Sequence, residues 1–174
     1  MPSITPAATH AGTDDREKIW RLIKDAHSAL LVTIAPGGEL DSRPMGCLQT
    51  GFDETLWFVT FRHSPKVEEI SRNDRVLVSY AKPSDYEYVS LSGQAELVDD
   101  RARLKQLWTE GMRVWFPGGP DDPELALLAV TVDEAKYWAN AASMVSYAWS
   151  YVKAALTGKR PSPGEVGDTE TIRF

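Results

Sequence analysis

The sequence predicts a mainly β fold, a small antiparallel barrel of about six strands with helices at its periphery. Segments rich in β-branched residues follow one another at short spacing, and helical patterns occur only as insertions between some of them. A doubly wound parallel sheet would instead need a helix after nearly every strand. The 174 residues suffice for one such domain, and 43% hydrophobic with 25% charged residues is ordinary globular composition.

Each predicted element rests on a local pattern of residue types. Strands are predicted over residues 29–35, 42–50, 55–61, 75–81, 86–98 and 125–132, with a shorter one over 169–174. Helices are predicted over residues 14–27, 65–73, 99–108 and 148–156. Residues 1–13, rich in Pro, Ser, Thr and Ala, are expected to form a flexible tail before a single domain over residues 14–174.

Turn and cap residues separate these elements. Residues 36–38, Pro-Gly-Gly, form a turn that predicts a hairpin between the first two strands. Ser64 suits a helix N-cap, and Pro65 suits the first helical position, where its missing N–H costs nothing. Gly93 predicts a bulge within its strand. Turn and cap residues therefore support several of the element boundaries that the periodicity predicts.

Charge and hydropathy exclude several classes of partner and location. The formal net charge of −6 argues against nucleic-acid binding, because a phosphate backbone is held mainly by excess Lys and Arg. The longest apolar run, residues 125–132, is far shorter than the ~20 residues that span a bilayer, and the N-terminus lacks the pattern of a secretory signal. Cys47, the only cysteine, cannot form an internal disulfide, which fits a cytoplasmic protein.

The sequence also lacks the motifs of several kinds of catalytic and metal site. The three histidines have no partners at zinc-ligand spacing, so no metal is predicted. The chain has no G-x-S-x-G elbow, P-loop or G-x-G-x-x-G, which removes the local signals for hydrolases, nucleotide triphosphatases and Rossmann dinucleotide binding. His63 could act as a general base, but a histidine beside a helix cap is the better supported interpretation, because no nucleophile or orienting acid is placed near it by sequence.

One group of polar residues suits a phosphomonoester. Arg43 stands at a strand start, Thr60 near a strand end, and Ser64 and Lys66 at a helix N-terminus. An Arg fork can bind two phosphate oxygens, a Lys adds a point charge, and the unpaired N–H groups of a helix start supply further donors. The alternative is that Arg43 and Lys66 are solvated surface charges and that Ser64 only caps the helix.

Aromatic residues and the lone thiol allow two interpretations each. Six Trp is a high count for one small domain, and Trp115, Phe116 and Trp138 lie outside the most regular strands. Aromatic side chains in such places line a planar ligand or an interface, or else belong to the core, where aromatic residues most often sit. Cys47 is first of all a small buried hydrophobe, because nothing near it in sequence clearly lowers its pKa.

Four motifs, in their order and spacing, resemble the FMN-binding split barrel of the pyridoxamine 5′-phosphate oxidase-like superfamily, in its general stress protein branch. They are Ser42-Arg43-Pro44-Met45, Trp57-Phe58-Val59-Thr60, Ser64-Pro65-Lys66-Val67-Glu68-Glu69-Ile70 and Ser92-Gly93-Gln94-Ala95. The likeness extends through Trp115-Phe116-Pro117-Gly118-Gly119, residues 127–130, Tyr137-Trp138 and residues 154–158, so that it covers residues 14–174.

The resemblance implies a six-stranded antiparallel split β-barrel with flanking helices, a homodimer, and FMN at the subunit interface. By position, Arg43, Lys66 and Ser64 would hold the phosphate. The backbones of Pro44-Met45 and Val59-Thr60 would meet the isoalloxazine edge, and Phe58 is also implied to be a cofactor-binding residue. The residues implied to approach the flavin from the other subunit are Trp115, Phe116 and Trp138.

The C-terminus departs from the pattern of pyridoxamine phosphate oxidases. Those enzymes end with an Arg-x-His element that helps to bind the vitamin substrate, whereas this chain ends Glu170-Thr171-Ile172-Arg173-Phe174. Oxidation of pyridoxamine phosphate is therefore not expected. Two functions stay open: an FMN-dependent oxidoreductase with an unidentified substrate, and a non-catalytic flavin-binding or flavin-sensing stress protein. A split barrel that binds another planar cofactor, such as haem or a deazaflavin, is a third alternative.

Overall fold

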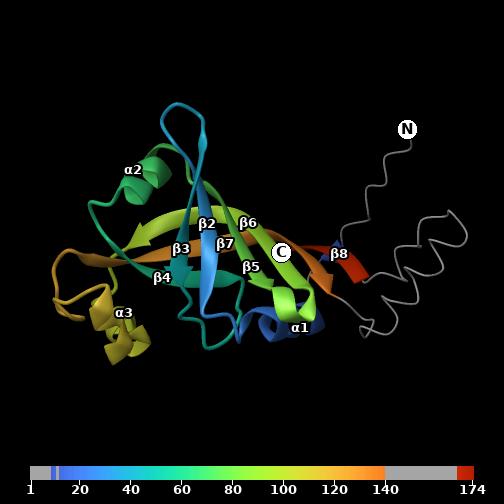
Figure 1. Cartoon of the computed structure of the whole chain (residues 1–174). Helices are drawn as coiled ribbons and strands as arrows, with labels where there is room; N and C mark the ends of the chain where they lie inside the picture. Colours follow the sequence, from blue (N-terminus) through green and yellow to red (C-terminus); the bar gives the residue numbers. More distant parts are fainter. Residues whose placement is uncertain (1–8, 11, 140–167) are drawn as a thin grey trace, which may run out of the picture.

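The computed structural model describes residues 9–10, 12–139 and 168–174 and confirms the mainly antiparallel β fold (Figure 1). The strands are β1 (Thr9–His10), β2 (Ser28–Ile34), β3 (Leu40–Gly46), β4 (Thr55–Phe61), β5 (Arg75–Lys82), β6 (Glu87–Val98), β7 (Leu125–Ala139) and β8 (Asp168–Arg173). The helices are α1 (Thr13–Ile23), α2 (Pro65–Arg72) and α3 (Arg101–Leu107), with 3-10 turns η1 (Pro83–Asp85) and η2 (Glu110–Val114). The predicted helix over residues 148–156 lies outside the described residues.

The described strands form one eight-stranded sheet rather than the six predicted. Its order is β1-β8-β7-β6-β5-β2-β3, with β4 paired to β7. The two additional strands are β8, which matches the short strand predicted at the C-terminus, and β1, which no sequence pattern predicted. β1 lies within the segment expected to be a tail and pairs in parallel with β8, Thr9 opposite Ile172. All other pairs are antiparallel.

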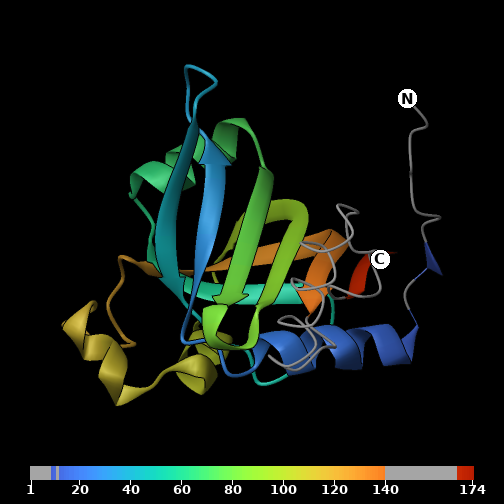
Figure 2. The ribbon, with the colours of Figure 1, turned by 45° about the vertical axis from the view of Figure 1, so that its right-hand side comes forward.

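β4 occupies a place that sequence order does not suggest. The sequence predicts three consecutive strands, but β4 leaves β3 and pairs along its whole length with the first half of β7, from Thr55 opposite Thr131 to Phe61 opposite Leu125. Figure 2 shows β4 and β7 crossing behind the upright strands β2, β3 and β5. The second half of β7 pairs with β8, which explains why β7 continues past the predicted end at residue 132. β3 and β4 thus face each other without forming a ladder.

The core fills the inside of this curved sheet. The apolar face of α1, with Ile19, Leu22 and Ile23, closes one end of the barrel (Figure 2). A second, smaller cluster lies under α3 and η2, where Leu104 is almost completely buried. Among the described residues, no helix is long and apolar enough to cross a membrane.

The β6–β7 ladder changes register between Ser92 and Gly93, which confirms the predicted irregularity. A Cβ atom on Gly93 would lie 2.0 Å from the carbonyl oxygen of Thr131, which is backbone and cannot rotate away. We expect Gly93→Ala to destabilise the protein by roughly 1–3 kcal/mol, an overpacking cost that lowers the melting temperature by several degrees. Gly51→Ala is the matched control, because its Cβ would meet nothing within 4 Å. Equal melting temperatures for the two variants would contradict the expectation.

Candidate functional site

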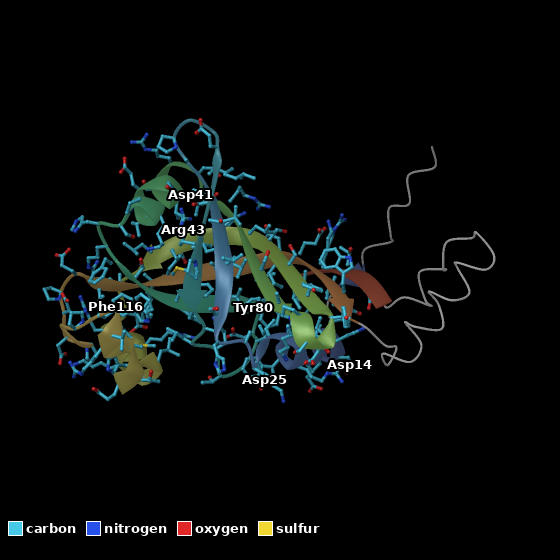
Figure 3. The ribbon with its side chains drawn as sticks, viewed as in Figure 1. Asp14, Asp25, Asp41, Arg43, Tyr80 and Phe116 are labelled. Atoms are coloured by element: carbon cyan, nitrogen blue, oxygen red, sulfur yellow. The ribbon has the colours of Figure 1, made fainter. Side chains whose placement is uncertain are left out.

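A pocket of about 530 Å³ opens between β3 and β4, bounded by the start of α2 and by the η2 segment. It brings together residues that are far apart in sequence, and Figure 3 shows Arg43 beside α2 and Phe116 near η2. The predicted site residues that line it are Arg43, Pro44, Met45, Val59, Thr60, Lys66, Trp115 and Phe116. Sequence reasoning did not place His27, Cys47, Leu48, Phe61 and Met112 there, although they line it too.

The end of the pocket near α2 is cationic. Lys66 Nζ donates a hydrogen bond to Thr60 Oγ1 at 3.2 Å, and Thr60 Oγ1 lies 3.3 Å from Ser64 Oγ. Burial and the nearby Arg43 guanidinium lower the pKa of Lys66, while Glu69 acts in the opposite direction. The Arg43 side chain is only 17% exposed. Arg43 and Lys66 are therefore partly buried neighbours rather than solvated surface charges.

Ser64 has the backbone of an N-cap, with φ −89° and ψ 151°, and Pro65 is the first residue of α2 as predicted. The Ser64 hydroxyl makes no capping hydrogen bond and instead lies beside Thr60. Ser64 itself does not line the pocket, but it adjoins the cationic end through this contact. The positive end of the α2 dipole points to the same place, which adds to the attraction for an anion.

Arg43 is held by partners that sequence reasoning missed. Its guanidinium donates to Glu69 Oε2 at 2.9 Å, to Asp41 Oδ2 at 2.8 Å and to the hydroxyl of Thr33. Glu69 and Thr33 are buried, whereas Asp41 is exposed. Two sequence signals could have indicated that Thr33 and Glu69 are buried. Strand alternation places Thr33 on the same face as Leu31, and Glu69 precedes Ile70 on the apolar side of its helix.

The opposite end of the pocket is aromatic. Phe116 packs edge-on against Phe61 with ring centroids 5.1 Å apart, and Met112 is buried beneath them. Trp115 follows η2 and is 75% exposed at the rim. The resemblance implies that Trp115 and Phe116 approach a flavin from the other subunit, but here they line the pocket that contains the same chain's Arg43.

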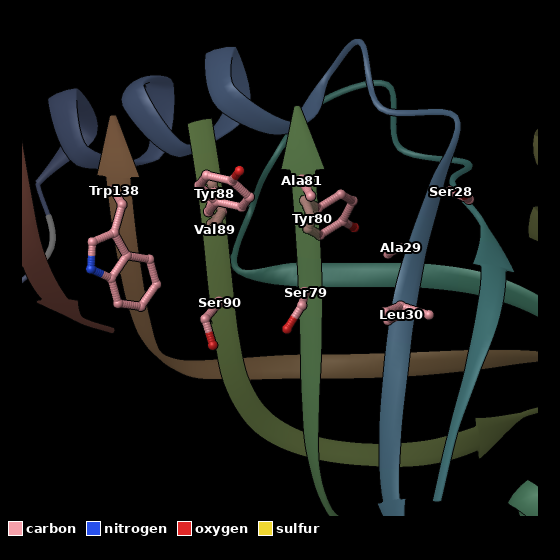
Figure 4. Close-up of a pocket in the computed structure, with 10 residues that line it drawn as sticks. All are labelled: Ser28, Ala29, Leu30, Ser79, Tyr80, Ala81, Tyr88, Val89, Ser90 and Trp138. Atoms are coloured by element: carbon pink, nitrogen blue, oxygen red, sulfur yellow. The ribbon is translucent and has the colours of Figure 1, made fainter. Parts of the chain in front are cut away.

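Two predicted residues lie elsewhere. Phe58 is fully buried in the barrel core opposite Leu128, because strand alternation turns it inward with Leu56. Trp138, 43% exposed on β7, lines a second hollow of about 370 Å³ on the face formed by β2, β5, β6 and β7 (Figure 4). Leu30 and Tyr88 are the other large exposed side chains there. Ser28 lines both this hollow and the pocket, so the two adjoin.

Cys47 lines the pocket, but its environment makes it a poor nucleophile. Burial raises the pKa of the thiol to about 11. At pH 7 only on the order of 0.01% is then thiolate, the form that attacks electrophiles. We expect iodoacetamide to alkylate native Cys47 far more slowly than the same residue in denatured protein, as measured by mass spectrometry. Equally fast labelling of native and denatured protein would show that the thiol is not suppressed.

Comparisons with known proteins agree on the family. Residues 14–162 match the family described as pyridoxamine 5′-phosphate oxidase like. A crystal structure from Jannaschia sp. CCS1, of a protein assigned as general stress protein 26, is 23% identical with a TM-score of 0.72, covering 94% of this chain and all of the other. That likeness shows the shared split-barrel fold.

Two further relatives are similar in sequence as well. The general stress FMN/FAD binding protein from Xanthomonas citri is 26% identical with a TM-score of 0.65, covering 76% of this chain and 94% of the other. Protein bli-3 from Neurospora crassa is 26% identical over 133 residues, 70% of this chain, and the chain spans 63% of that protein's length. Because the family match extends over most of the sequence and includes the strands and helix that form the pocket, this protein belongs to the pyridoxamine 5′-phosphate oxidase-like family.

Proposed function

We propose that this protein binds FMN in the pocket between β3 and β4, with the phosphate at Arg43 and Lys66. The observation that carries the proposal is the pairing of a cationic end with an aromatic end in one pocket of about 530 Å³, within the range of small-molecule sites. The Xanthomonas citri relative, described as FMN/FAD binding, supports a flavin as the ligand.

The cationic end suits a phosphate monoester. Three of the five N–H groups of Arg43 donate to Thr33, Asp41 and Glu69, which leaves two that can donate to phosphate oxygens. Lys66 adds a second charge from the first turn of α2. The Thr60 hydroxyl lies 3.2 Å from the Lys66 ammonium and can donate to a further oxygen, and Ser64 Oγ lies 3.3 Å from Thr60 Oγ1. A phosphate there would be met by charge and by directed hydrogen bonds together.

The walls of the pocket suit the ring system. β3 is the last strand of its sheet, and β4 pairs only with β7 among the described residues, so each turns one backbone edge toward the pocket. Backbone N–H and C=O groups require partners. The edges at residues 44–45 and 59–60 could pair with the donors and acceptors of an isoalloxazine, while Met45 and Phe116 offer apolar contact.

A bound flavin would supply electron or hydride transfer, and the chain would bind it, orient it and exclude water. One candidate function is therefore an FMN-dependent oxidoreductase. The second is a non-catalytic flavin binder, and it is favoured because few residues that line the pocket remain for acid–base chemistry. Arg43 and Lys66 are assigned to the phosphate, and the Cys47 thiol stays protonated. Among the described lining residues, that leaves His27 for general acid–base chemistry.

The absorption spectrum of the purified protein and its anaerobic reduction test the proposal in two steps. A flavin spectrum supports FMN, whereas a haem or deazaflavin spectrum would replace it with another planar cofactor. Anaerobic NADH or NADPH should then bleach the flavin of an oxidoreductase. Absence of bleaching with both donors would favour the non-catalytic flavin binder.

We further propose a cytoplasmic homodimer whose interface adjoins the flavin. The hollow of Figure 4 exposes Leu30, Tyr88 and Trp138 together, and its shared residue Ser28 connects it to the pocket. Large exposed apolar side chains that line one hollow commonly mark an interaction site. A second copy packed on this face would cover the three side chains and bring residues of both chains close to the pocket.

A further inference from the structure

A buried carboxylate stands behind the cationic end of the pocket. Glu69, in the second turn of α2, is 7% exposed. Its Oε2 accepts a hydrogen bond from Thr33 Oγ1 at 2.5 Å and another from Arg43 at 2.9 Å. Arg43 also donates to the Thr33 hydroxyl, so the three side chains close a ring. The ring joins β2, β3 and α2, the elements beside the phosphate end.

A carboxylate buried this deeply is costly unless charge and hydrogen bonds compensate it. Here Arg43 supplies the charge, and Thr33, which is completely buried, supplies the second donor. Glu69 and Thr33 also order Arg43, because an Arg side chain without these partners could adopt many rotamers. Glu69 and Thr33 thus restrict the guanidinium to one position.

Glu69 also lies close enough to Lys66 to affect its charge. Its carboxylate opposes the lowering of the Lys66 pKa that burial and Arg43 produce. Two cations held close together repel each other, and a nearby anion reduces that repulsion. Glu69 therefore helps to keep Arg43 and Lys66 near each other while no phosphate is present.

We propose that Glu69 and Thr33 are positioning residues that hold the Arg43 guanidinium in the orientation that recognises a phosphate monoester. The proposal rests on the proposed function, because it assumes that the phosphate of FMN binds at Arg43. It extends that function by assigning the preference for FMN over riboflavin to a buried ring of side chains, two of which need not contact the ligand. Preorganisation of this kind increases affinity by removing the cost of ordering the side chain during binding.

The test compares FMN with riboflavin, which lacks only the phosphate, on the full chain freed of flavin. Glu69→Gln keeps the shape and the acceptor oxygen but removes the charge. We expect it to weaken FMN binding about tenfold and to change riboflavin affinity less than twofold. Glu68→Gln is the matched control, since Glu68 is the neighbouring carboxylate on α2 but is 64% exposed and pairs with Arg72 instead of Arg43. It should leave both affinities almost unchanged.

A variant with both Arg43→Ala and Glu69→Gln tests whether Glu69 affects FMN binding through Arg43. In an Arg43→Ala background, Glu69→Gln should cause no further loss of the FMN preference. A further loss there, an equal loss for both ligands, or tighter FMN binding by Glu69→Gln would each overturn the proposal. The last result would mean that Glu69 merely competes with the phosphate for Arg43.

Thr33 keeps the proposal testable if Glu69→Gln does not fold. Thr33→Val removes the hydroxyl from the ring and should reduce the FMN preference, whereas Thr33→Ser retains the hydroxyl and should preserve it. Equal preferences in these two variants would count against the ring. Failure of the proposed function has a different result: a wild-type protein that binds FMN no more tightly than riboflavin would remove the phosphate site itself.

Discussion

Replacing Arg43 or Lys66 with Ala should weaken FMN binding by ten- to a hundredfold while changing riboflavin affinity much less. Both cations are partly buried at one end of the pocket, where charge-assisted hydrogen bonds are worth about 1.5–3 kcal/mol each. Riboflavin has no phosphate and does not gain from either charge. Titration by the quenching of flavin fluorescence measures both ligands under the same conditions.

The Arg43 variant needs a separate measurement of stability. Arg43→Ala leaves the buried Glu69 carboxylate without its charge partner, and breaking a buried pair in this way costs about 3–5 kcal/mol. Arg43→Lys retains a charge but not the planar fork, so it should show an intermediate loss of FMN preference at lower structural cost. Melting temperatures of the flavin-free proteins separate these effects from binding.

Arg72→Ala is the control for a general loss of positive charge. Arg72 lies in the same helix as Lys66, but it is exposed and pairs with Glu68 one turn away. Its removal should leave the affinities for both ligands unchanged. Equal losses for FMN and riboflavin in the Arg43 and Lys66 variants would remove the assignment of the phosphate to this end of the pocket.

Local signals predicted the elements well because they depend on neighbours in the chain. The strand over Thr55–Phe61 has the predicted boundaries, and Pro65 opens α2 as expected from its fixed φ. The hairpin of β2 and β3 is also present, but β3 ends at Gly46 rather than residue 50. Beyond Gly46 the chain turns away toward β4, and that departure depends on distant contacts rather than on strand propensity.

Pairing between distant segments could not be predicted in this way. β4 pairs with β7 about 70 residues further along, and no local pattern distinguishes that partner from β3. The end of β7 at Ala139 depends likewise on β8. The sequence therefore predicted the strands but not the separation of β3 from β4 that forms the pocket.

Sequence reasoning grouped the charged residues that line the pocket but missed the residues that hold Arg43 in place. Arg43 and Lys66 stand in motifs that suit a phosphate, whereas Glu69 follows another acidic residue, Glu68, and only its place before Ile70 indicates burial. Its burial follows from α2 packing beside β2, a tertiary contact. Phe58 belongs to one of the motifs that resemble the family, but its side chain lies in the core.

Dilution of the flavin-bound protein should release FMN if the cofactor lies between subunits. Binding and dimerisation are then thermodynamically linked, so any condition that separates the subunits lowers the affinity for FMN. Conversely, FMN at about 100 times its Kd should stabilise the dimer by roughly 2.7 kcal/mol, visible as a higher melting temperature. Analytical ultracentrifugation at several micromolar concentrations, with detection at a flavin wavelength, follows both quantities together.

Trp138→Ala should weaken flavin retention and shift the proposed dimer toward monomer without changing the preference for FMN over riboflavin. Trp138 is half-exposed in the hollow next to Tyr88 and does not line the pocket that contains Arg43 and Lys66. Leu97→Ala is the control, because Leu97 is also an exposed apolar residue of the sheet but does not line the hollow. A monomer that retains full FMN occupancy at micromolar concentration would refute the shared site, because Trp138 would then have no connection to the flavin.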